Sequence, residues 1–62
     1  MPMSDSDKRL LMRRFDELDY LEQQRTLASE SAFQRWLQRV APAIFNRIRN
    51  ALSSLWNWLR GL

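Results

Sequence analysis

The chain has 62 residues, a formal net charge of +3, 45% hydrophobic residues, one Gly, no Cys and no His. A chain of this length builds one small core, and without Cys and His it lacks zinc sites, disulfides and Ser–His or Cys–His catalysis. Because it is too apolar for a disordered chain and too poor in glycine for a phosphate-binding loop or many tight turns, we expect a single all-α domain of two to three helices.

The first predicted helix covers about residues 5–26. N-cap oxygens for its start come from four consecutive residues, Ser4, Asp5, Ser6 and Asp7. The apolar side chains Leu11, Phe15 and Leu18 then follow at i, i+4, i+7, which predicts one buried face. Through residues 23–30 this pattern lapses, so we expect a turn there. The alternative is one long helix up to residue 41, because no Gly or Pro interrupts it.

The second predicted helix covers residues 31–41. Ser31 and Gln34 have the spacing of a capping box. An apolar stripe at helical spacing follows, made of Phe33, Trp36, Leu37 and Val40. Pro42 should end this helix and suits the first position of the next one. Residues 1–41 therefore form an N-terminal helical hairpin or long helix.

The third predicted helix, about residues 43–60, is the most strongly amphipathic. At about 100° per residue, one arc of roughly 160° holds only apolar side chains: Ile44, Phe45, Ile48, Ala51, Leu52, Leu55, Trp56, Trp58, Leu59 and Leu62. The opposite arc holds only polar ones: Asn46, Arg47, Arg49, Asn50, Ser53, Ser54, Asn57 and Arg60. These arginines and asparagines exclude a transmembrane placement. Residues 42–62 are thus a basic, Trp-containing C-terminal segment.

The net charge hides a strong asymmetry along the chain. Residues 1–30 hold all seven acids and five bases, a net charge of −2, whereas residues 31–62 hold five arginines and no acid, a net charge of +5. All three tryptophans also lie in the basic half. Such asymmetry indicates contact with a membrane or a nucleic acid.

We therefore expect a non-enzymatic adaptor or regulatory protein whose last helix docks reversibly on an anionic membrane surface. The predicted docking residues are Ile44, Phe45, Ile48, Leu52, Leu55, Trp56, Trp58 and Leu59. The predicted basic face consists of Arg35, Arg39, Arg47, Arg49 and Arg60. The first residues lack a basic region followed by an apolar run, so the expected location is the cytoplasm, with peripheral attachment to the membrane.

Several alternatives remain open from the sequence. The same apolar face could form the third wall of a three-helix bundle or lie in the groove of a protein partner. The first helix, through Leu11, Phe15 and Leu18, could instead pair with its own copy in a homodimeric bundle.

Two minor alternatives are RNA or DNA binding through the arginine stripe and a membrane-active peptide. A nucleic-acid partner is not expected, because the chain has no recognised nucleic-acid-binding motif, a single Lys and seven acids that would repel phosphate. Asp16, Asp19 and Glu22 form a carboxylate row that we interpret as surface residues in salt bridges with nearby arginines. No cofactor, metal or catalytic residue is expected.

Overall fold

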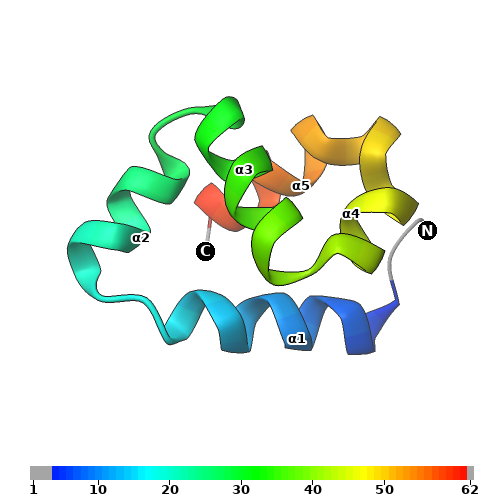
Figure 1. The fold of residues 1–62 in the computed structure, drawn as a ribbon, viewed down its shortest axis with the longest axis horizontal. Coiled ribbons are helices and arrows are strands. Elements are labelled where there is room, and N and C mark those ends of the chain that lie inside the picture. Colours follow the sequence, from blue (N-terminus) through cyan, green and yellow to red (C-terminus); the bar gives the residue numbers. More distant parts are fainter. Residues whose placement is uncertain (1–3, 62) are drawn as a thin grey trace.

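The computed structural model describes residues 4–61 and has an all-α fold, as predicted (Figure 1). In chain order the elements are α1 (Asp5–Asp16), α2 (Tyr20–Leu27), α3 (Glu30–Val40), α4 (Pro42–Ile48), the 3-10 helix η1 (Arg49–Ala51) and α5 (Leu52–Arg60). Leu62, which the helical projection places on the apolar face, lies outside the described residues, as do residues 1–3.

The start of α1 agrees with the predicted capping. The side chain of Ser4 accepts a hydrogen bond from the backbone N–H of Asp7 at 3.2 Å. Acidic residues occupy the first turn and basic residues the last turn, the arrangement that the helix dipole favours. Leu11 is fully buried, and Phe15 and Leu18 pack against the core.

The prediction of one helix over residues 5–26 was wrong, because the chain breaks before α2. Asp19 Oδ1 accepts a hydrogen bond from the backbone N–H of Glu22 at 2.8 Å and so caps a new helix. The Gln23 side chain donates to the backbone carbonyl of Phe15 at 3.1 Å, near the end of α1. These two contacts satisfy backbone groups that helix ends leave unpaired, which makes the break tolerable.

The turn expected in residues 23–30 is confirmed, but the cap that follows it differs from the prediction. Ser29, rather than Ser31, is the N-cap of α3, and its side chain accepts a hydrogen bond from the backbone N–H of Ala32 at 3.1 Å. Ser29 has extended dihedrals (φ −149°, ψ 158°), as an N-cap requires, so the helix starts at Glu30. The alternative of one continuous helix up to residue 41 is therefore wrong.

The two serines offer a matched test of this cap. We expect Ser29→Ala to lower the free energy of unfolding by about 1 kcal/mol, because it removes the N-cap acceptor. Ser31→Ala, in an exposed position of the first turn, should change it by less than about 0.5 kcal/mol. Urea denaturation followed by far-UV circular dichroism measures both, and a larger loss for Ser31→Ala would contradict the assignment.

The C-terminal segment bends, so the prediction of one helix over residues 43–60 was also wrong. Pro42 begins α4 as predicted, but Ile48 (φ −108°, ψ 15°), just before η1, and Ala51 (φ −116°, ψ 20°), the last residue of η1, leave helical dihedrals. A straight helix of this length would span about 27 Å, whereas the eleven residues of α3 span about 16 Å. The bend allows both α4 and α5 to pack against α3.

The core is centred on α3, which packs against α2, α4 and α5, while α1 runs along one side of the molecule (Figure 1). Its buried apolar side chains come from four helices and the Ala41 junction: Leu11, Phe33, Trp36, Leu37, Ala41, Ile44, Phe45, Ile48, Leu55 and Leu59. Residues 1–41 and 42–62 thus contribute to one common core. Within residues 4–61 no helix combines the length and apolar character needed to cross a membrane.

Polar contacts also join the C-terminal segment to the rest of the chain. Arg47 of α4 forms an ion pair with Asp7 of α1, with Nη2 and Oδ1 2.7 Å apart. The Ser53 hydroxyl of α5 donates to the Glu30 carboxylate at the start of α3. Both contacts place basic or polar residues of the last third of the chain against acidic residues of the first half.

Candidate functional site

The eight residues predicted to dock on a membrane or partner lie in the core of the fold or pack against it. Five of them are at most 7% exposed: Ile44, Phe45, Ile48, Leu55 and Leu59. The remaining three, Leu52, Trp56 and Trp58, are partly buried against the same core. These side chains therefore contact the chain's own helices, which is the bundle arrangement considered as an alternative above.

The two tryptophans of α5 are covered by residues of the same chain. Trp56 Nε1 donates to the backbone carbonyl of Leu27 at 3.3 Å, and the Arg60 guanidinium lies 4.4 Å from the centre of the Trp56 ring. Lys8 Nζ lies 5.7 Å from the centre of the Trp58 ring. Both indoles thus help to attach α5 to the bundle.

The five arginines of the predicted basic face do not form one continuous surface. Arg47 is paired with Asp7, and the Arg60 guanidinium lies over the Trp56 ring, so both already contact groups of the same chain. Arg49 lies 5.7 Å from the Phe45 ring centre and makes a long contact of 3.4 Å with Asn46. Arg35 and Arg39 are exposed and form no ion pair with any residue in the range 4–61.

Arg35 and Arg39 belong to a continuous polar side of α3. We define the α3 polar face as Ser31, Gln34, Arg35, Gln38 and Arg39. At about 100° per residue these positions fall on one arc, opposite the buried Phe33, Trp36 and Leu37. The α3 polar face contains no acid, and its side chains make no hydrogen bond to the other residues that the structure describes.

Shallow grooves flank the α3 polar face on both sides, and each groove contains an arginine from another element. The first groove, of about 170 Å³, is lined by Arg25, Thr26, Ala32, Arg35, Trp36 and Arg39. The second, of about 240 Å³, is lined by Gln34, Gln38, Phe45, Arg49 and Leu52. The face is therefore a ridge of arginine, glutamine and serine between Arg25 of α2 and Arg49 of η1.

Arg25 is the member of this surface that the sequence did not reveal. It lies in the N-terminal half, whose net charge is −2, and no local pattern connects it with Arg35 and Arg39. The short connection between α2 and α3 brings the three arginines to one groove. The N-cap at Ser29 is the sequence signal that could have revealed the position of Arg25. It starts α3 earlier than predicted and so shortens the connection between α2 and α3.

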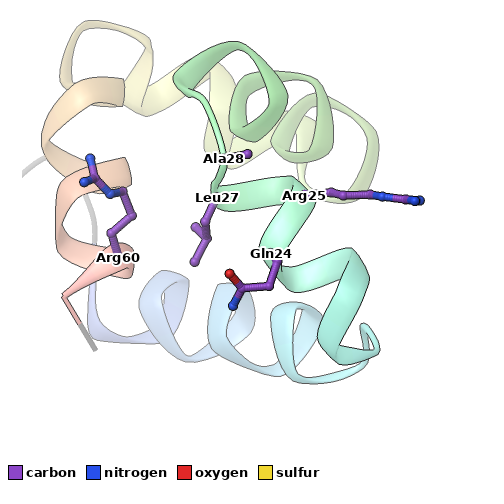
Figure 2. Close-up of a pocket in the computed structure, with 5 residues that line it drawn as sticks. All are labelled: Gln24, Arg25, Leu27, Ala28 and Arg60. Atoms are coloured by element: carbon purple, nitrogen blue, oxygen red, sulfur yellow. The ribbon is translucent and has the colours of Figure 1, made fainter.

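A wider hollow lies between α2 and α5, but it lacks convergent polar groups. It has a volume of about 590 Å³ and is lined by Gln24, Arg25, Leu27, Ala28 and Arg60. Figure 2 shows the Arg25 side chain extending away from Arg60 and out of the hollow. Because Arg60 is engaged with Trp56, few polar groups remain here to orient a small molecule.

The acidic residues lie mainly around the connection between α1 and α2. Asp19 of the carboxylate row serves as the cap of α2, and Glu17 pairs with Arg14 at 3.2 Å. Among residues 4–61 no group of three carboxylates is arranged to hold a metal ion. This end of the molecule is thus acidic, whereas the α3 polar face is basic.

Comparison with known proteins does not assign this surface. No family model, curated protein or solved structure matches the chain.

Proposed function

We propose that this protein is a non-enzymatic binding module that docks reversibly, through its α3 polar face and the flanking arginines, on a partner rich in phosphate groups. The proposal rests on one observation. Arg25, Arg35 and Arg39 line the same groove, and none of them forms an ion pair with a residue in the range 4–61. Guanidinium groups bind phosphate through paired, charge-assisted hydrogen bonds.

The proposal keeps an anionic partner but changes the docking surface. An interfacial helix binds a bilayer by burying an exposed apolar face, and the apolar face of the C-terminal segment packs inside this fold. Docking through that face would require α4 and α5 to leave the core. The exposed arginines need no such rearrangement, so electrostatic attachment is favoured over insertion.

A matched pair of double variants tests the proposal. Arg35→Ala with Arg39→Ala removes two charges from the α3 polar face, and Arg9→Ala with Arg13→Ala removes two from exposed positions of α1 at the same i, i+4 spacing. We expect the first variant to bind long-chain inorganic polyphosphate at least about tenfold more weakly, because each hydrogen bond to a charged group contributes about 1.5–3 kcal/mol. The second should retain affinity within about threefold.

Isothermal titration calorimetry at several salt concentrations measures both affinities, and circular dichroism verifies that both variants are folded. Equal weakening of the two variants would mean that net charge alone attracts the polyanion. In that case the α3 polar face would not be the binding site, and the proposal would be wrong.

A further inference from the structure

The α3 polar face carries hydrogen-bonding groups that phosphate binding alone does not require. Ser31, Gln34 and Gln38 alternate with the two arginines along the exposed side of α3. A lipid headgroup layer or a polyphosphate chain needs only the cations. Glutamine, arginine and serine together match the donor and acceptor patterns at base edges, with arginine pairing with guanine and glutamine with adenine.

From this juxtaposition we infer that α3 binds in the major groove of B-form DNA. The inference rests on the proposed function and names its partner. The major groove, about 12 Å wide, admits one α-helix, whose diameter with side chains is about 10–12 Å. The α3 polar face is a ridge between two shallow grooves, and it is this side of α3 that we place in the major groove.

The flanking arginines are placed to contact the DNA backbone. Arg25 of α2 and Arg49 of η1 lie on opposite sides of α3, each in one of the two grooves. A helix in the major groove has a phosphate strand on either side, and contacts to these strands fix the orientation of the protein. In helix-turn-helix proteins a second helix likewise enters the groove after a short turn, while the first helix meets the backbone.

The nearby acids do not lie on this ridge. Glu30, at the start of α3, is turned toward α5, where it accepts a hydrogen bond from Ser53. Glu22 lies three residues before Arg25 on α2. Its negative charge repels a phosphate near Arg25 and so weakens binding at that position. Glu22→Gln is therefore expected to tighten DNA binding.

Fluorescence anisotropy with a labelled duplex of mixed sequence tests the inference on the full chain. We expect binding that weakens with salt, and Arg25→Ala should lower the slope of log affinity against log salt concentration by about 0.9, the value for one phosphate contact. Arg35→Ala with Arg39→Ala should abolish binding at moderate salt, whereas the Arg9→Ala, Arg13→Ala control should retain it.

The glutamines give a readout that a purely electrostatic surface would not show. Selection from a randomised duplex pool should enrich a short sequence with the unaltered chain. With Gln34→Ala and Gln38→Ala the adenines of that sequence should no longer be enriched, while guanines paired with the arginines stay enriched and the salt slope stays unchanged. Duplex RNA should bind more weakly than DNA, since its A-form major groove is too narrow for side chains to reach the base edges.

The outcomes separate this inference from the proposed function. One outcome is that the protein binds polyphosphate, binds DNA and RNA duplexes with equal affinity, and enriches no sequence. That outcome would overturn the DNA inference but not the proposed function. Tighter binding to vesicles of anionic phospholipid than to DNA, with the same dependence on Arg35 and Arg39, would identify a membrane surface instead. If neither polyphosphate nor DNA binds, both proposals are wrong.

Discussion

Leu55→Glu is expected to unfold the whole chain. Leu55 of α5 is 7% exposed and lies in the common core, so a carboxylate there would be buried without a partner. Burying an unpaired charge costs several kcal/mol, and a core of this size rarely supplies more than about 3–5 kcal/mol. Far-UV circular dichroism and the cooperativity of thermal melting measure the loss.

The neighbouring Ser54 provides the control for this experiment. Ser54→Glu adds the same charge one residue earlier on α5, at an exposed position, and should change stability by less than about 0.5 kcal/mol. If Leu55→Glu instead leaves α1 to α3 folded and cooperative, α5 is a detachable element. That result would favour docking of the apolar face on a membrane, as the sequence first suggested.

Leu37→Ala should destabilise the chain by about 2–5 kcal/mol, which is comparable with its entire expected stability. Leu37 is fully buried in α3, the helix that packs against α2, α4 and α5, so the cavity would adjoin most of the core. Leu21→Ala is the matched control, because Leu21 is 56% exposed on α2. It should change the free energy of unfolding by less than about 0.5 kcal/mol in urea denaturation.

A similar loss in both leucine variants would mean that α3 is not the centre of the fold. The distinction matters for function, because the proposed binding surface is the outer side of the same helix. Phe33, Trp36 and Leu37 anchor α3 inward and thereby hold Arg35 and Arg39 outward at a fixed spacing. A rigid helix positions binding side chains with less entropic cost than a mobile segment would.

Several features of the fold could be predicted because they depend on neighbouring residues. The cap at Ser4 and the start of α4 at Pro42 follow from side chains within one turn of the helix end. The apolar faces of α3 and the C-terminal segment follow from helical periodicity, and their residues within the range 4–61 are buried or partly buried. Arg35 and Arg39 were correctly placed on the polar side of their helix.

The breaks in the long helices could not be predicted from neighbouring residues alone. Asp19 and Glu22 have the spacing of a cap, but the same residues also suit a helix interior, and only packing decides between them. Likewise, no Gly or Pro marks the bend at η1. That bend exists because α4 and α5 must both reach the shorter α3.

The sequence by itself determined an all-α chain, the polarity of each helical face and the division into an acidic and a basic half. The tertiary structure decided which apolar face is covered and which arginines remain free. Arg47 is neutralised by Asp7, forty positions away, whereas Arg25 joins Arg35 and Arg39. The physical reason is that caps and periodicity act within about one helical turn, while burial and ion pairing depend on contacts between helices far apart in the chain.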